Sequence, residues 1–109
     1  MNWRDEYRSK LVSAEEAVKV VKSGDLVAIT FGGEPRKLPE ALLARFGEIE
    51  NVEIMQGDPL TPFGWFEAEF QRSFRVNVEN AFRGFVREAI RERRADFTPN
   101  LFSIRWKPI

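Results

Sequence analysis

Apolar residues along the first half of this chain alternate between helical spacing and short continuous runs. Ser13 and Glu16 fit a reciprocal helix cap, and apolar residues at helical spacing follow them. The next apolar run contains β-branched residues and is continuous, which is typical of a strand covered on both faces of a parallel sheet. Five elements are predicted in this half. Two helices come first, over Trp3–Ser9 and over Ala14–Lys22, the second ended by Gly24, and a strand follows over Asp25–Phe31. A third helix has Pro39 in its first turn, carries Leu38, Leu42 and Phe46 and ends at Gly47, and a second strand covers Asn51–Gln56.

The second half of the chain continues this alternation less regularly. Two prolines and two glycines in GDPLTPFGWFEAEF predict a long loop, with a helical turn near Trp65–Phe70. The elements predicted after it are a strand or extended segment over Gln71–Val78, a helix over Asn80–Arg93, and a turn over Ala95–Pro99 that leads into a last short strand over Asn100–Ile104. Alternating helices and strands predict an α/β fold with a parallel sheet. We expect residues 1–109 to form a single partial domain, because such a sheet needs more chain to cover its faces and edges.

Composition excludes several classes of site. The chain has 17 basic and 17 acidic residues, and a net charge of zero gives no general attraction to nucleic acid or to an anionic membrane. It has no cysteine and no histidine, which excludes disulfides, thiolate catalysis and the commonest metal ligand. No apolar run approaches the roughly 20 residues of a membrane span, and the charged start MNWRDEYRSK is unlike a signal peptide. We therefore expect a cytoplasmic protein without nucleic-acid or membrane partners.

The turn after the first predicted strand is the main candidate site. Gly32, Gly33, Glu34 and Pro35 stand between that strand and the next helix. One interpretation is a tight turn, for which glycine and proline are the usual residues. The other is a ligand site, because glycine lets the backbone approach a bound molecule closely, and open α/β sheets gather ligands at the carboxyl ends of their strands. The local pattern by itself favours the turn.

Two further sets of charged residues are candidates for binding. Arginines share one face of the last predicted helix: Arg83, Arg87, Arg91 and Arg94. We expect a solvated face paired with neighbouring acids, and binding of the phosphate groups of a ligand or of nucleic acid is the alternative. Acids of the long loop are also close in sequence: Asp58, Glu67 and Glu69. No histidine supports them, so we expect no metal site.

Four stretches of the chain, in order and spacing, carry a resemblance to a known family. They are EYRSKLVSAEEAVKVVKSGDLVAI, GGEPRKLPEAL, NVEI and GFVREAIRERRADFTPNLFS. Together they resemble the start of the acetyl-CoA hydrolase/transferase family, which includes the acetate, butyryl and 4-hydroxybutyrate CoA-transferases. The resemblance runs to about Ser103 and covers nearly all of this chain, but only the opening portion, roughly a quarter, of a typical member.

The resemblance implies a chemistry that the residue pattern does not. Members of the family move CoA between carboxylic acids or hydrolyse acyl-CoA, and a glutamate attacks the thioester. That glutamate lies in the later half of family members, so no catalytic residue is expected here and Glu34 is not assigned this role. The resemblance instead implies that Gly32, Gly33, Glu34 and Pro35 line an acyl-CoA pocket. Coenzyme A is then a substrate rather than a bound cofactor, and a small carboxylate is the second substrate.

The resemblance also has consequences for partners. A second chain or a missing C-terminal half is expected to carry the catalytic glutamate, and uncovered apolar surface predicts an oligomer. Two alternatives stay open: a non-catalytic module that binds CoA or a nucleotide or assembles with itself, and a truncated inactive chain. One departure concerns Arg93, which stands where family members commonly have glycine. A left-handed cap there costs about 1 kcal/mol, unless the helix ends differently.

Overall fold

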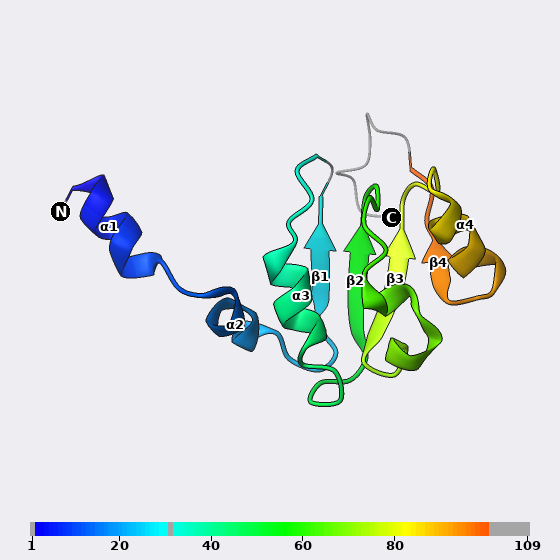
Figure 1. Ribbon diagram of the computed structural model, residues 1–109, viewed down its shortest axis with the longest axis horizontal. Helices are drawn as coiled ribbons and strands as arrows, with labels where there is room; N and C mark the ends of the chain where they lie inside the picture. Colours follow the sequence, from blue (N-terminus) through cyan, green and yellow to red (C-terminus); the bar gives the residue numbers. More distant parts are fainter. Residues whose placement is uncertain (1, 31, 101–109) are drawn as a thin grey trace.

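A parallel four-stranded sheet with the strand order β1-β2-β3-β4 forms the centre of the computed structural model, which describes residues 2–30 and 32–100 (Figure 1). The elements follow along the chain as α1 (Trp3–Lys10), α2 (Ala14–Ala17), η1 (Val18–Val20), β1 (Leu26–Ile29), α3 (Lys37–Leu43), β2 (Val52–Gln56), η2 (Gly64–Phe66), η3 (Ala68–Phe70), β3 (Phe74–Val78), α4 (Gly84–Arg91) and β4 (Ala95–Phe97). All three strand pairs are parallel. The α/β fold with a parallel sheet is therefore confirmed.

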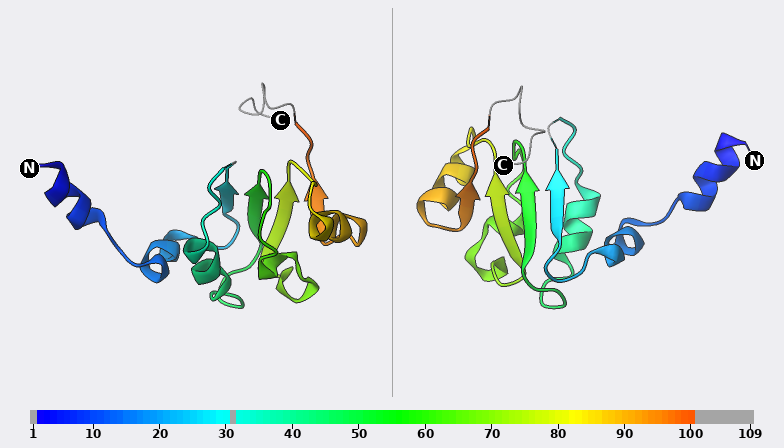
Figure 2. Two further views of the ribbon diagram at one scale, coloured as in Figure 1. Left: turned by 45° about the horizontal axis from the view of Figure 1, so that its top comes forward. Right: turned by 180° about the vertical axis from the view of Figure 1, so that it is seen from behind.

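The connections between the strands all lie on one face of the sheet. Figures 1 and 2 show α3, the short helical turns η2 and η3, and α4 on the same side of the strands. Right-handed crossovers between strands that follow one another across a sheet require this arrangement. The core lies beneath these connections and is built by alternate residues of the central strands with side chains from η2 and α4: Val52, Ile54, Phe74, Val76, Val78, Trp65, Phe66, Val86 and Ala89.

The first strand differs from its prediction in one respect. Its apolar run suggested cover on both faces, but β1 is an edge strand and its two faces differ. Val27 and Ile29 are half-buried, whereas Ala28 is exposed and Leu26 is 60% exposed. The expectation is wrong for the described residues, because every crossover of this sheet lies on the side that Val27 and Ile29 face.

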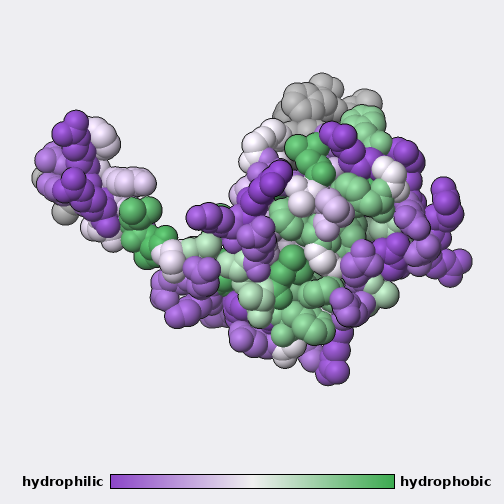
Figure 3. Space-filling view, in the orientation of Figure 1, coloured by the Kyte–Doolittle hydropathy of each residue, from purple (hydrophilic) through white to green (hydrophobic). Residues whose placement is uncertain are grey.

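The N-terminal helix α1 forms an arm that projects from the body (Figures 1 and 2). The side chain of Asn2 caps it by accepting a hydrogen bond from the amide of Asp5 at 3.0 Å. No residue of α1 is buried, and Trp3 is 72% exposed. The helix predicted over Trp3–Ser9 is thus confirmed, but it forms without tertiary cover. In Figure 3 the arm is mostly hydrophilic, while apolar residues gather on the helix-bearing face of the body.

Two predicted helices end earlier than expected. Ser13 accepts a hydrogen bond from the amide of Glu16 at 3.1 Å, as predicted, but α2 tightens into η1 after one turn. Gly24 is left-handed with φ of 86°, yet it lies in the following turn and its amide donates to the carbonyl of Glu50. Similarly, α3 has Pro39 in its first turn but ends at Leu43, and Gly47 takes its φ of 85° in the turn before β2.

The helix predicted over Asn80–Arg93 begins later, at Gly84. The amide of Asn80 is still bonded to the carbonyl of Gly57, so the chain follows the end of the sheet before it turns. The Arg87 guanidinium then donates to the carbonyl oxygens of Ala81 and Phe82, which holds this segment outside the helix. Phe82 is consequently 70% exposed and does not join the core.

The same helix ends in a left-handed cap at Arg93. Its φ is 60°, its amide donates to the carbonyl of Ile90, and the amide of Arg94 donates to the carbonyl of Ala89. These two hydrogen bonds define a Schellman motif, in which glycine is the usual left-handed residue. The helix therefore keeps the usual ending and accepts the strain of a non-glycine residue.

The turn predicted over Ala95–Pro99 is wrong. Ala95–Phe97 form β4, which pairs in parallel with Val76–Val78 of β3. Ala95 is buried while Asp96 is exposed. Because polar residues occur in short edge strands as well as in turns, the composition of this segment did not distinguish the two. The strand predicted over Asn100–Ile104 lies outside the described residues beyond Asn100.

Candidate functional site

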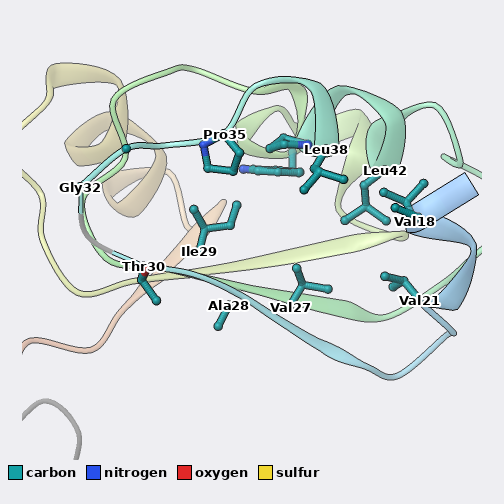
Figure 4. A pocket seen from close by; sticks show the side chains of 14 residues that line it. Val18, Val21, Val27, Ala28, Ile29, Thr30, Gly32, Pro35, Leu38 and Leu42 are labelled. Atoms are coloured by element: carbon teal, nitrogen blue, oxygen red, sulfur yellow. The ribbon is translucent and has the colours of Figure 1, made fainter. Parts of the chain in front are cut away.

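An apolar cavity of about 400 Å³ lies between β1 and α3 (Figure 4). Val27 and Ile29 point into it from β1, and Leu38 and Leu42 face them from α3. Val18 and Val21 line the same cavity from the segment before β1, so residues that precede the strand and residues that follow it both contribute to the cavity wall. Its volume falls within the range of about 300–1,000 Å³ that is usual for ligand pockets, and its walls suit an apolar group.

Three of the four predicted site residues line this cavity: Gly32, Gly33 and Pro35. Gly32 and Gly33 have φ of 72° and 62°, in the region that L side chains rarely adopt. No atom lies within 4 Å of the place where a Cβ would stand on either glycine. The two glycines are therefore required by the backbone conformation of the turn, and the space beside them in the described structure is open.

Glu34, the fourth predicted residue, is not among the residues that line the cavity. Its carboxylate accepts hydrogen bonds from the side-chain amide of Gln56 at 2.7 Å and from the backbone amides of Leu60 and Thr61 at 2.9 and 3.0 Å. Glu34 thus joins the loop after β1 to the loop after β2. These three hydrogen bonds connect two loops of the protein, and the Glu34 carboxylate is not part of the cavity wall.

Three buried polar atoms in this region have no hydrogen-bond partner among the described residues: Gln56 Oε1, Asp58 Oδ1 and Trp65 Nε1. Such atoms are uncommon in folded proteins. Trp65 is fully buried, packs its ring against Phe63 and Phe74, and also lines the cavity. Sequence reasoning did not select it, because a tryptophan in an aromatic-rich loop is most simply a core residue.

The predicted arginine face forms in part, because Arg83, Arg87 and Arg91 are exposed at four-residue spacing whereas Arg94 is partly buried. Arg83 precedes α4, Arg87 is engaged with backbone carbonyls, and Arg94 lies beyond the helix. The Arg94 guanidinium lies 2.7 Å from the Glu92 carboxylate and also donates to the carbonyl of Phe66. Expected pairing with neighbouring acids is therefore found for Arg94. A smaller cavity of about 230 Å³ lies nearby, with charged side chains in its lining: Arg75, Arg93, Arg94 and Asp96.

Other kinds of site have no geometric basis in the described parts of the chain. Within residues 2–30 and 32–100, no three acidic, histidine or cysteine side chains come together as a group able to hold a metal ion. Over the same residues, no helix has the length and apolar character needed to cross a membrane.

Comparisons with known proteins found relatives that match nearly the whole chain. Residues 1–105 match the model of the acetyl-CoA hydrolase/transferase N-terminal domain. The chain is 40% identical over 103 residues to a succinyl-CoA:cyclohexane-1-carboxylate CoA transferase of Geobacter metallireducens, a match that covers 93% of this chain and 23% of that protein. It is 32% identical over 103 residues to a 4-hydroxybutyrate coenzyme A transferase of Clostridium kluyveri, covering 94% of this chain and 24% of that protein.

A solved structure shares the fold. The structure of a RipA mutant superposes with a TM-score of 0.78 at 23% identity, covering 95% of this chain and 26% of that one. The chain thus spans about a quarter of the length of the relatives that it matches. The family match extends over nearly the whole sequence and includes the turn that lines the cavity. On these grounds, the chain belongs to the acetyl-CoA hydrolase/transferase family, and its residues 1–105 match the N-terminal domain of that family.

Proposed function

We propose that this chain is the N-terminal part of an enzyme that moves CoA between carboxylic acids or hydrolyses acyl-CoA. In this proposal Gly32, Gly33 and Pro35 form one wall of the acyl-CoA pocket, and Glu34 fixes the loop that carries them. The catalytic glutamate is supplied from elsewhere, by a second chain or by a further portion of the protein. Acyl-CoA and a small carboxylate are the substrates.

One observation carries the proposal: the turn shared with the family stands at the carboxyl end of a parallel strand and lines one end of an apolar cavity. Open α/β sheets bind their ligands outside the carboxyl ends of strands. The cavity walls are aliphatic, which suits the acyl group rather than the charged phosphates of CoA. Two of the relatives named above are CoA transferases, which supports the same class of reaction.

The proposal is tested in a chimera. Residues 1–105 of this chain replace the matching quarter of the Geobacter metallireducens transferase, and CoA transfer is measured for the chimera and for the isolated chain. We expect turnover from the chimera and none from the isolated chain. Robust turnover by the isolated chain, with a catalytic glutamate mapped within residues 1–109, contradicts the proposal.

A matched pair of glycine variants tests the pocket wall. Gly33→Val adds a side chain at a left-handed residue that lines the cavity, while Gly24→Val does the same at φ of 86° away from it. Neither position has an atom within 4 Å of the added Cβ, so their strain is comparable. We expect Gly33→Val to raise KM for acyl-CoA about tenfold, equivalent to about 1.4 kcal/mol of binding, and Gly24→Val to leave KM unchanged. Equal effects of the two variants contradict a binding role for the turn.

A further inference from the structure

A second cavity lies at the opposite end of the sheet from the glycine turn. Its volume is about 230 Å³, and it is lined by residues from the beginning of β3 and from the turn that leads into β4. All four strands are parallel, so these amino ends lie together (the lower ends of β3 and β4 in Figure 1), whereas Gly32 and Gly33 follow the carboxyl end of β1. The proposed function therefore leaves this cavity without a role.

The strand pairing leaves a gap where this cavity forms. β4 begins at Ala95, which pairs with Val76, so the first two residues of β3 have no strand beside them on this side. Gln71 joins the two sides of the gap, because its side-chain amide donates to the carbonyl of Arg94 at 2.7 Å, and both residues line the cavity. The wall is thus held by contacts within the protein itself.

Arg93 lines this cavity at a cost to the backbone. Its φ of 60° is in the left-handed region, and a glycine at this position would form the same Schellman cap without strain. Within residues 2–30 and 32–100, the Arg93 guanidinium has no hydrogen bond or ion pair that would compensate this strain. Strained residues of this kind are concentrated at functional sites, where a ligand uses the group that they present.

Three of the four charged side chains in the lining have free hydrogen-bonding groups. Arg94 is the exception, since it is engaged with a neighbouring carboxylate and with a backbone carbonyl. The Arg75 guanidinium lies 3.8 Å from the Glu53 carboxylate, which is longer than the about 2.7–2.9 Å of a charge-assisted hydrogen bond. The carboxylate of Asp96 has no hydrogen bond or ion pair in the described part of the chain. The cavity therefore offers donors from Arg75 and Arg93 and an acceptor from Asp96.

The charges around the cavity argue against a site for a simple anion. Three arginines are balanced by three acids, two of which stand beside the cavity rather than in its lining: Arg75, Arg93 and Arg94 against Asp96, Glu53 and Glu92. A balanced group of charges exerts little long-range attraction on an anion. Recognition must then depend on direct hydrogen bonds, and the ligand must supply both an acceptor for the guanidinium groups and a donor for Asp96.

We propose that this cavity binds a small phosphate ester that carries a hydroxyl group. Arg75 and Arg93 donate hydrogen bonds to the phosphate, because the planar guanidinium fork matches phosphate oxygens. Asp96 accepts a hydrogen bond from the hydroxyl group of the same ligand, which selects against free phosphate. The cavity volume is below the range of about 300–1,000 Å³ that is usual for larger ligands, so the ligand is small, and glycerol 3-phosphate represents its class.

Calorimetric titration of the isolated chain at fixed ionic strength tests the proposal, with glycerol 3-phosphate, inorganic phosphate and glycerol as probes. We expect glycerol 3-phosphate to bind at least about tenfold more tightly than inorganic phosphate, and glycerol to give no heat of binding. The proposal is overturned if glycerol 3-phosphate does not bind, or binds no more tightly than inorganic phosphate.

A pair of arginine variants separates a defined site from general electrostatic attraction. Arg93→Gly removes a guanidinium from the cavity and keeps the left-handed cap, while Arg83→Ala removes an exposed arginine that lies outside the cavity and has no partner among the described residues. Both variants lose one positive charge. We expect Arg93→Gly to raise the dissociation constant for glycerol 3-phosphate at least about tenfold and Arg83→Ala to leave it within about twofold. Equal effects of the two variants refute the site, and urea titration checks that both are folded.

Asp96→Ala tests the hydroxyl contact, because the carboxylate attracts the hydroxyl group and repels the phosphate. We expect this variant to bind glycerol 3-phosphate about fivefold more weakly and inorganic phosphate about twofold more tightly than the parent chain. A variant that binds both probes more tightly contradicts the role given to Asp96.

Amide chemical shifts in nuclear magnetic resonance spectra of the chain locate the bound probe. Addition of glycerol 3-phosphate is expected to shift the amide signals of residues 71–76 and 93–96 and to leave those of residues 27–35 unchanged. Shifts confined to residues 27–35 overturn the location. Because binding is measured on the isolated chain without CoA transfer, failure of this site leaves the proposed function in place, and failure of the proposed function leaves this site in place.

Discussion

Glu34 offers the sharpest test of how the turn is held. Its carboxylate is the acceptor of three hydrogen bonds that join two loops, from Gln56, Leu60 and Thr61. Glu34→Ala removes all three bonds, whereas Glu34→Gln keeps the shape and one of the two acceptor oxygens. Comparing the two variants therefore separates the loss of these three hydrogen bonds from their weakening.

The expected loss follows from the surroundings of each donor. Gln56 is 1% exposed, so the alanine variant leaves its amide group buried without a partner, which costs about 2 kcal/mol. The amide of Thr61 is part-buried and adds about 1 kcal/mol, while that of Leu60 is exposed and turns to water at little cost. We expect Glu34→Ala to lower the free energy of unfolding by about 3 kcal/mol and Glu34→Gln by about 1 kcal/mol.

Urea unfolding followed by far-ultraviolet circular dichroism measures these differences. Glu69→Ala is the control, because Glu69 is an exposed acid of η3 with no hydrogen bond or ion pair in the described structure. We expect this variant to change the free energy of unfolding by less than about 0.5 kcal/mol. A Glu34→Ala variant as stable as the control refutes the supporting role. In the chimera, Glu34→Gln is expected to keep turnover within about tenfold, because a support is weakened rather than a nucleophile removed. Complete loss of turnover in a normally folded Glu34→Gln chimera shows instead that the carboxylate takes part in the reaction.

Three other predictions concern stability. Arg93→Gly relieves the strain of the left-handed cap of α4 and is expected to raise the free energy of unfolding by about 1 kcal/mol. Arg91→Gly, within the same helix, is expected to lower it by about 1 kcal/mol. Both variants are measured by urea titration, and a neutral or destabilising Arg93→Gly contradicts the strain argument. Gly33→Val is expected to lower the free energy of unfolding by about 1 kcal/mol, and a thermal midpoint equal to that of the parent speaks against the left-handed φ of this residue. Deletion of residues 2–10 removes an arm with no buried residue, and we expect the free energy of unfolding to change by less than about 0.5 kcal/mol in a urea titration. A larger loss indicates that the arm packs against the body in solution.

The elements that sequence predicted best are those whose signals are local. β2 follows the predicted Asn51–Gln56 within one residue, and the cap of α2 forms at Ser13 as its pattern indicates. Hydrophobic periodicity and capping report the backbone preference of a few neighbouring residues, so they need no knowledge of the rest of the fold. The family resemblance is stronger still, because it depends on the order and spacing of segments over nearly the whole chain.

The errors arise where a distant contact decides the local structure. β4 has the composition of a turn and becomes a strand only because Val76–Val78 offer it an edge. The predicted arginine face forms only in part, because Arg87 also reaches carbonyl oxygens that precede the helix and Arg94, beyond the helix, reaches the carbonyl of Phe66. Neither contact follows from helical spacing, since both depend on how the crossovers are folded over the sheet.

The sequence alone determined the class of this protein, an α/β segment of a CoA-transferase-like family with zero net charge and without histidine or cysteine chemistry. Only the tertiary structure decided what the turn after β1 does with its four residues. It placed Gly32, Gly33 and Pro35 on the cavity and gave Glu34 partners that lie 22 to 27 residues away. It also showed that β1 has one covered face and one free edge. The physical reason is that a residue's own preferences are local, whereas pairing, burial and the partners of a carboxylate are set by which crossovers bring distant segments together.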